Sequence, residues 1–255
     1  MKTAHIVTGG KGNVGKTAFA ELLTCAAIAA GQNPVLIDGD SKKQTFSRLR
    51  GKSVKTVVLS DDPMFESQPD LIWHQLAKEK QNVIVDLAAQ SDHLFSSWLR
   101  VRGIADIANY SGAQIIKWWI ADLDSDSFDE LADLCEEFPT IKHVLVQSHF
   151  RARPEMWAET LATNKSIKGA IASGLEVIEF PRMFVGVMDS LRRKKITFTD
   201  VLLDEEHKKV DMLNRSTVIN WVAGAVAEVG TVYEFENIDA SAEKVKPADT
   251  KKVKK

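Results

Sequence analysis

Short apolar runs alternate with longer helical patterns along this chain. Runs rich in Val and Ile lie at residues 5–8, 34–38, 56–59, 83–86, 115–121, 143–147 and 177–180. Several are apolar at consecutive positions, as in strands of a parallel sheet that is covered on both faces. Helical spacing of apolar residues occurs at 16–30, 70–80, 125–137 and 204–229. The alternation predicts an α/β fold with a twisted, mostly parallel sheet and helices on both faces.

Composition limits the functional classes. The chain has 255 residues, of which 44% are apolar, enough for a substantial core, and we expect one domain over residues 1–235. Thirty-three Lys and Arg against 35 Asp and Glu give a formal charge of −2, without the basic bias of a dedicated nucleic-acid binder. Cys25 and Cys135 form no CxxC pair, so we expect two buried thiols in a reducing compartment, with neither a disulfide framework nor a zinc site.

The two ends of the chain differ in character. No basic N-terminal region precedes a long apolar run, and nowhere do about 18 apolar residues follow one another, so we expect a cytoplasmic protein. Residues 236–255 are rich in Lys and poor in bulky apolar side chains, and we expect a disordered tail. The tail lacks the apolar face of a membrane-targeting helix, which disfavours a membrane anchor.

The clearest motif is a phosphate loop. A predicted strand at residues 4–8 runs into GxxxxGK[ST], formed by Gly10, Gly15, Lys16 and Thr17, and then into an Ala- and Leu-rich helix. The glycines let backbone N–H groups converge on phosphate oxygens, and the helix adds its positive N-terminal end. We expect Lys16 to reach the β- and γ-phosphates and Thr17 to ligate Mg²⁺. The residues assigned to the nucleotide here are Gly10, Lys11, Gly12, Asn13, Val14, Gly15, Lys16, Thr17 and Ala18.

A second lysine makes the loop more specific. The segment Lys11-Gly-Asn-Val-Gly-Lys-Thr17 resembles the deviant Walker A motif, KGGxGKT, of the ParA/MinD family of partitioning and positioning ATPases. The resemblance implies that Lys11 crosses a dimer interface and contacts the nucleotide of the other subunit, so that ATP holds a homodimer together. Asn13 stands where the family has a glycine. Because Asn tolerates positive φ best among non-glycine residues, we expect the loop to keep its form.

Within this family the chain looks most similar to the StbB and TraL proteins of conjugative plasmids. That resemblance implies a slow, partner-stimulated ATPase that acts in plasmid partition, stability or transfer. Its partners would be plasmid-encoded DNA-binding or transfer proteins. Two other interpretations remain open: a small-molecule kinase or synthetase similar to dethiobiotin synthetase, and a nucleotide-dependent adaptor whose hydrolysis is vestigial.

Further acidic residues complete the predicted site. By resemblance, Asp40 activates the attacking water, and Asp38 lies near Mg²⁺, although Asp38 could instead cap a following helix. Asp86 ends an apolar strand in the Walker B pattern and is expected to hold Mg²⁺ through a water. Relatives place adenine contacts where Phe180-Pro-Arg182 ends a later strand, which makes Pro181 a candidate for the base. A guanine-specific NKxD segment is missing, which favours ATP over GTP.

The most basic internal stretch is a candidate for nucleic-acid contact. Arg192, Arg193, Lys194 and Lys195 follow one another, and ParA relatives bind nucleoid DNA nonspecifically through surface Lys and Arg. The cluster and the Lys-rich tail could contact DNA phosphates in a salt-dependent manner. The alternative is a solvated surface.

Overall fold

A single parallel sheet organises the chain. The computed structural model describes residues 2–78, 81–204 and 208–236. The seven strands have the order β3-β2-β4-β1-β5-β6-β7, and every neighbouring pair is parallel. Their bounds are β1 Thr3–Thr8, β2 Val35–Gly39, β3 Val54–Thr56, β4 Val83–Leu87, β5 Gln114–Ala121, β6 Lys142–Ser148 and β7 Glu176–Phe180. The predicted α/β class is confirmed, with a sheet that is wholly parallel.

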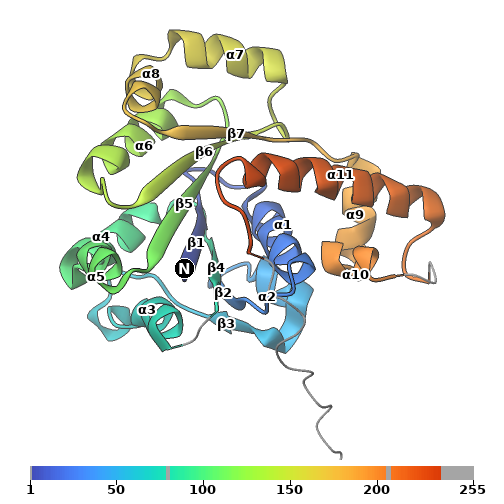
Figure 1. Cartoon of the computed structure of the whole chain (residues 1–255), viewed down its shortest axis with the longest axis horizontal. Coiled ribbons are helices and arrows are strands. Elements are labelled where there is room, and N and C mark those ends of the chain that lie inside the picture. The colour runs from blue at the N-terminus through green and yellow to red at the C-terminus, as the bar shows by residue number, and fades with distance from the viewer. Residues whose placement is uncertain (1, 79–80, 205–207, 237–255) are drawn as a thin grey trace, which may run out of the picture.

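Helices cover both faces of this sheet (Figure 1). One face carries α1 (Lys16–Ala29), α2 (Thr45–Arg50), α9 (Val185–Lys194), α10 (Phe198–Leu202) and α11 (Met212–Gly230). The other carries α3 (Asp70–Lys78), α4 (Asp92–Arg102), α5 (Ile104–Ser111), α6 (Ser125–Glu137), α7 (Pro154–Thr163) and α8 (Lys165–Ala172). Two 3₁₀ turns, η1 (Gly51–Ser53) and η2 (Pro63–Phe65), lie beside β3 and before α3.

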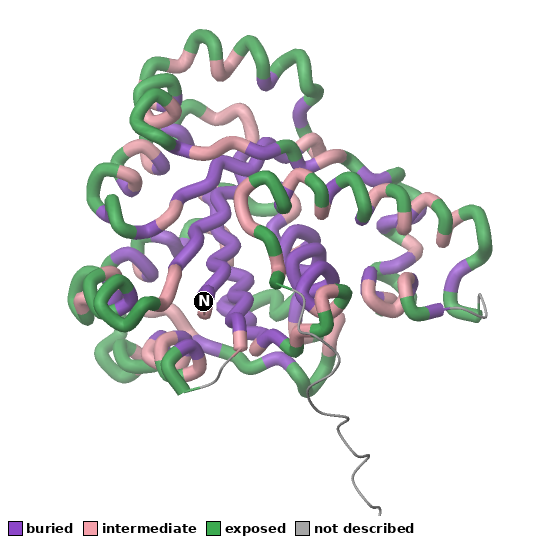
Figure 2. The backbone as a smooth tube through the Cα atoms, in the orientation of Figure 1, coloured by how far each residue is buried: buried purple, intermediate pink, exposed green. Residues whose placement is uncertain are grey.

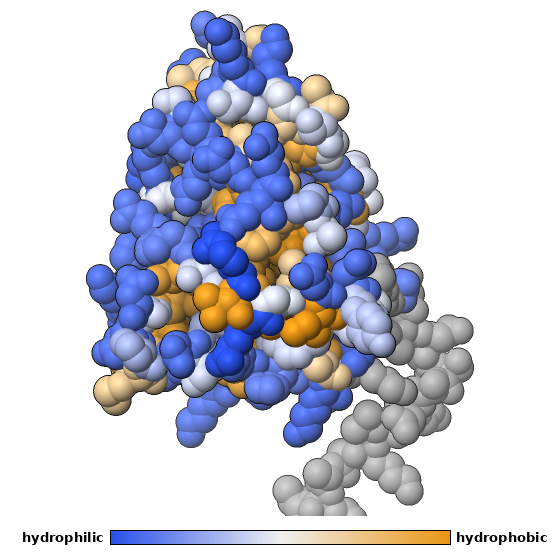
Figure 3. Space-filling view, turned by 90° about the vertical axis from the view of Figure 1, so that its left-hand side faces the viewer, coloured by the Kyte–Doolittle hydropathy of each residue, from blue (hydrophilic) through white to orange (hydrophobic). Residues whose placement is uncertain are grey.

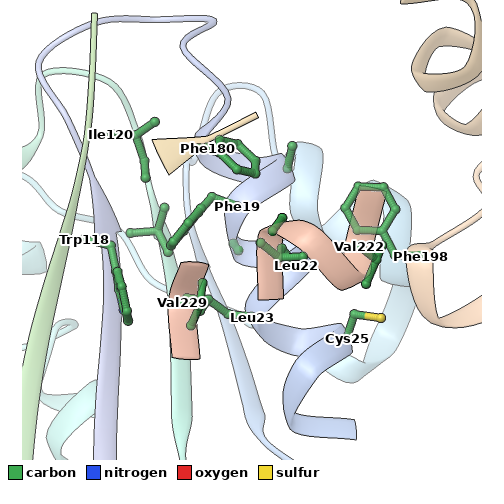
Figure 4. Close-up of a cluster of buried hydrophobic side chains, with 14 of the residues drawn as sticks. Phe19, Leu22, Leu23, Cys25, Trp118, Ile120, Phe180, Phe198, Val222 and Val229 are labelled. Carbon is green, nitrogen blue, oxygen red and sulfur yellow. The ribbon is translucent and has the colours of Figure 1, made fainter. Parts of the chain in front are cut away.

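Adjacent residues of a strand enter different cores. Trp118 belongs to the core cluster on the α1 face and Trp119 to the cluster on the α6 face, and both are fully buried. This arrangement explains why the strands are apolar at consecutive positions. The indole N–H of Trp118 donates to Nδ1 of His5 at 3.2 Å, and that of Trp119 donates to the Ser127 hydroxyl at 3.0 Å. Figure 4 shows the first cluster, in which Phe19 of α1 lies beside Trp118, and Figure 2 shows how deeply the strands and α1 are buried.

Two element boundaries differ from the sequence prediction. The run at 56–59 was predicted as a strand, but β3 is Val54–Thr56: the Val57 amide still donates to the Asp38 carbonyl of β2, and the Val58 amide then donates to the Gln68 side chain. The helix predicted at 204–229 begins only at Met212. The Asp204 carboxylate accepts from the backbone amides of Lys208 and Lys209, and Asp211 caps the start of α11.

Other predictions have mixed outcomes. Cys25 is buried, whereas Cys135 is only half-buried, and both thiols are free. Residues 237–255 of the predicted tail lie outside the described residues. No helix among the described residues combines the length and apolarity needed to cross a bilayer.

The face over α4 and α5 is mostly hydrophilic with separate apolar groups (Figure 3).

Candidate nucleotide-binding site

The loop between β1 and α1 has the backbone form that the sequence predicted. Asn13 has φ 62° and Gly15 has φ 108°, so Asn13 occupies the left-handed region as expected. Gly15 is also the N-cap of α1, and it offers no side-chain cap. No acidic residue lies in the first turn of the helix. The first-turn amides of α1 therefore form an N-terminus suited to an anion.

Two glycines fix where this loop lies. A Cβ on Gly9 would come within 2.3 Å of the Ile120 carbonyl oxygen in β5, so only glycine fits this close approach. A Cβ on Gly15 would lie 3.2 Å from the ring of Phe180 and 3.3 Å from that of Phe150. The loop is thus held between β5 and an aromatic pair, with a shape that larger residues would disturb.

Lys16 and Thr17 begin α1. Lys16 is only 8% exposed, and its ammonium group donates to the backbone carbonyl of Lys11. Burial lowers the pKa of Lys16 to about 8, although Asp86 and Asp40 act in the opposite direction. The Thr17 hydroxyl donates to Oδ2 of Asp86 at 2.7 Å. The predicted Walker A and Walker B residues are therefore in direct contact.

Asp86 is the buried carboxylate of the site. Asp86 lies near the end of β4 and is 3% exposed. Its Oδ1 has no hydrogen-bond partner among the residues that the structure describes. Burial, reinforced by the charges of Asp38 and Asp40, raises the pKa of Asp86 to about 7 against the hydrogen bond from Thr17. An unpartnered buried carboxylate oxygen is costly, and a divalent cation would offset that cost. Asp86 and Thr17 thus fit a Mg²⁺ site.

Asp38 and Asp40 have different surroundings. Asp38 accepts from the backbone amides of Asp40 at 2.9 Å and Ser47 at 2.8 Å, so both its oxygens serve the turn and α2. This is the capping geometry that was the alternative for Asp38. Asp40 accepts from the amides of Lys42 and Lys43 and borders a cavity that Lys16 also borders.

This cavity collects most of the predicted site. Its volume is about 440 Å³. The predicted residues that line it are Gly12, Asn13, Gly15, Lys16, Thr17, Ala18, Asp40 and Asp86. The predicted residues that are not among its lining are Gly10, Lys11, Val14, Asp38 and Pro181. The carbonyl of Val14 accepts from the Ser148 hydroxyl, and that of Pro181 accepts from the Trp221 indole at 3.0 Å.

Lys11 points elsewhere. Its side chain is 49% exposed and forms an ion pair with Asp124, and Asp122 is 4.0 Å away. The hydrogen bond to Asp124 raises the pKa of Lys11. Both acids follow β5. Their Asp-x-Asp spacing repeats that of Asp38 and Asp40 after β2 and is the one signal that could have identified them in the sequence.

The basic stretch of α9 is divided. All four residues are exposed, but only Arg192 and Lys195 line the cavity. The same cavity is also lined by Arg48 of α2 and by Lys43 of the turn before it. Sequence reasoning treated the four residues of the stretch as one surface and missed this division, although spacing of three and four residues on a helix could have indicated it.

Two buried ion pairs surround the site. In the first, Arg50 of α2 donates two hydrogen bonds of 2.6 Å to Glu21 of α1, which also accepts from the Phe198 amide. In the second, Lys117 of β5 pairs with Asp92 of α4 at 2.9 Å.

Asp92 also joins this second pair to the phosphate loop. It accepts from the hydroxyl of Thr8, which ends β1, at 3.0 Å, and from that of Ser96 at 3.1 Å. The two pairs connect α1 to α2 and α10, and β5 to α4. No local sequence pattern indicated them.

Comparisons with known proteins agree with part of the sequence interpretation. No model of a known protein family matches the chain. Protein TraL of Escherichia coli is 25% identical over 143 residues, 54% of this chain and 59% of TraL, so the match spans little more than half of that relative. Protein MobD of Acidithiobacillus ferrooxidans is 20% identical over 237 residues, 86% of this chain and 93% of MobD.

Among solved structures, the MinC:MinD cell division protein complex of Aquifex aeolicus contains a chain with a TM-score of 0.48 and 15% identity. The match covers 89% of this chain and 97% of that one. In the fold described above, the GxxxxGK[ST] segment lies between a strand and a helix, which is the context that this motif requires. The chain is thus similar to TraL at low identity, in agreement with the resemblance seen in the sequence.

Proposed function

We propose that this protein binds and hydrolyses Mg-ATP and acts as a dimeric switch in plasmid partition, stability or conjugative transfer. The observation that carries the proposal is the convergence of Lys16, Thr17, Asp40 and Asp86 on one cavity at the carboxyl ends of β2 and β4 and the start of α1. Ligands bind at this edge of open α/β sheets. The similarity to TraL supports the plasmid context.

The surroundings of each of these four residues support a role in nucleotide binding or hydrolysis. The Lys16 ammonium group and the first amides of α1 would bind the β- and γ-phosphate oxygens, and these oxygens would give buried Lys16 the anionic partner that it lacks among the described residues. Thr17 and Asp86 would hold Mg²⁺, which neutralises charge that develops on the phosphates. Asp40 would orient the attacking water.

Lys11 would serve the dimer. In the single subunit its ammonium group is bound to Asp124. An exposed ion pair of this kind contributes little to stability, so it can be exchanged for a phosphate of the partner's nucleotide. Dimerisation and nucleotide occupancy then become linked by mass action. Partner proteins would act on the ATP-bound dimer.

Nonspecific DNA binding is a lesser part of the proposal. Arg193 and Lys194 are exposed and do not line the cavity, so a bound nucleotide would leave them available to a polyanion. Two cations give only a weak, salt-dependent contact.

Sedimentation velocity tests the switch. Wild type, Lys11→Ala and Lys16→Ala are compared with ADP and with a nonhydrolysable ATP analogue, alongside fluorescent-nucleotide titrations. We expect wild type to dimerise only with the analogue, Lys11→Ala to bind nucleotide yet dimerise weakly, and Lys16→Ala to bind nucleotide poorly. A Lys11→Ala protein that dimerises like wild type would contradict the proposed dimer.

A further inference from the structure

We propose that α9 forms the wall against which the ribose and base of the nucleotide lie, with Arg192 placed over the face of the base. This inference rests on the proposed function, since it concerns the same nucleotide. It moves the base away from Pro181, where sequence resemblance had located it.

The extent of the cavity is the first argument. It begins at the phosphate loop, passes Ala18 and Glu21 on α1, and reaches Met188, Leu191 and Arg192 on α9. Its volume of about 440 Å³ lies within the range of pockets that hold whole small ligands, roughly 300–1,000 Å³. The phosphates need only the end at Lys16. A ligand anchored there would extend its other end toward α9.

The opposite side of the loop is already filled. The rings of Phe150 and Phe180 pack together with centroids 5.2 Å apart and lie against Gly15. Pro181 follows, and its carbonyl accepts the hydrogen bond from Trp221. None of these four side chains is among the lining of the cavity. The β6 and β7 ends therefore support the loop from behind and leave α9 as the open wall.

The chemistry of α9 suits a nucleoside. Met188 and Leu191 are 6% and 2% exposed, and both belong to the core cluster on this face, so they form a fixed apolar surface. Arg192 lies one turn after Met188 on the same face of the helix, next to that surface. A guanidinium group is planar and stacks on aromatic rings, which an ammonium group does not reproduce. Lys195 and Arg48 add positive charge near the sugar and phosphates.

The chain supplies its own matched control. Arg193 follows Arg192 on the same helix and is exposed, but it is not among the lining residues. Arg192→Ala and Arg193→Ala change the net charge equally, so any general electrostatic effect on an anionic ligand should appear in both. Only contact inside the cavity separates them.

The test compares two ligands that share the phosphates. Calorimetric titrations with Mg-ATP and with Mg-tripolyphosphate, which lacks ribose and base, are made on wild type, Arg192→Ala, Arg192→Lys and Arg193→Ala. We expect Arg192→Ala and Arg192→Lys to weaken ATP binding about tenfold. Tripolyphosphate affinity should change by less than about threefold in these variants, and Arg193→Ala should leave both affinities near wild type.

A rival variant makes the outcome decisive. Phe150→Ala should leave the ratio of the two affinities unchanged if the base lies on α9. The inference is overturned if Phe150→Ala alters that ratio while Arg192→Ala does not, or if Arg192→Ala weakens both ligands equally. Equal binding of ATP and tripolyphosphate by wild type would also overturn it, while leaving the phosphate site intact. If wild type binds neither ligand, the proposed function itself fails.

Discussion

Two regions of this molecule contain buried charged groups that differ in whether they have partners of opposite charge. In the core, Lys117 and Asp92 are 0% and 2% exposed and bind each other directly, with hydroxyl groups around them. At the phosphate loop, Lys16 and Asp86 are also buried, but Lys16 donates to a neutral carbonyl and Asp86 keeps one oxygen without a partner among the described residues. The core charges are complete in themselves, whereas those of the site need a ligand.

The pKa values express the same contrast. Burial moves the pKa of Lys16 down to about 8 and that of Asp86 up to about 7, so each group is shifted toward its neutral form. A buried charge that lacks an opposite partner costs several kcal/mol, and proteins keep such groups chiefly where a ligand compensates them. The difference therefore supports the proposal that the cavity at α1 is the functional site.

The largest expected effect concerns the two buried lysines, Lys117 in the core and Lys16 at the phosphate loop. Lys117→Ala leaves Asp92 buried without its partner and should lower the free energy of unfolding by about 3–5 kcal/mol. Lys16→Ala removes a buried charge that has no anionic partner among the described residues, so it should not lower that free energy, while it should reduce Mg-ATP affinity at least about a hundredfold. Urea unfolding and nucleotide titrations measure both. Equal losses of stability in the two variants would remove the distinction between the regions.

A second variant tests the acidic side of the site. Because its pKa is raised in the folded state, Asp86 contributes stability that is present at low pH and lost as pH rises through about 7. Asp86→Asn should therefore raise the free energy of unfolding of the ligand-free protein at pH 8, by roughly 1–3 kcal/mol. The amide oxygen can still accept from Thr17. The same variant should lose Mg²⁺-dependent nucleotide binding, and a destabilised Asp86→Asn protein at pH 8 would refute the account of this carboxylate.

Asp40 should separate binding from turnover. Its carboxylate already accepts two backbone amides, so its removal takes away no partner of the nucleotide. Asp40→Ala should bind Mg-ATP within about threefold of wild type and hydrolyse it at least about tenfold more slowly, with a persistent dimer. Phosphate release and light scattering follow the two properties. Wild-type turnover in this variant would mean that another residue orients the water.

The sequence predicted features that local patterns determine. Runs of consecutive apolar residues predicted the strands, and the GxxxxGK[ST] pattern from Gly10 to Thr17 predicted the loop. Within this loop Asn13 has the expected positive φ. It could not predict contacts that depend on tertiary packing. Glu21 and Arg50 are far apart in the chain and meet only because α2 folds back on α1.

The same limit explains the details that differ. Asp86 followed the Walker B pattern, but whether one of its oxygens is left without a partner depends on the packing around β4. Likewise, the start of α11 at Met212 depends on side-chain caps at Asp204 and Asp211 that compete with helical spacing.

The smallest expected effect concerns a core group that stays neutral. His5 is fully buried, and burial lowers its pKa to about 3. The unfolded chain therefore binds a proton that the folded one does not, and His5 reduces stability as pH falls below about 6.5, by up to about 1.4 kcal/mol per pH unit. Asp86 has the opposite sign in this range, so the comparison of wild type with His5→Phe isolates the histidine. The difference in stability between them should shift in favour of His5→Phe from pH 7 to pH 5.5. A pH-independent difference would show that His5 titrates normally.

Thermal unfolding with and without nucleotide tests the central claim most directly. A ligand at a hundred times its Kd adds about 2.7 kcal/mol, which should raise the Tm of a domain of this size by roughly 5–10 °C. We predict this rise for wild type with Mg²⁺ and a nonhydrolysable ATP analogue, its reduction when EDTA removes Mg²⁺, and its absence in Lys16→Ala. An unchanged wild-type Tm at millimolar nucleotide, or an equal rise in Lys16→Ala, would contradict the claim that these buried charges form a Mg-ATP site.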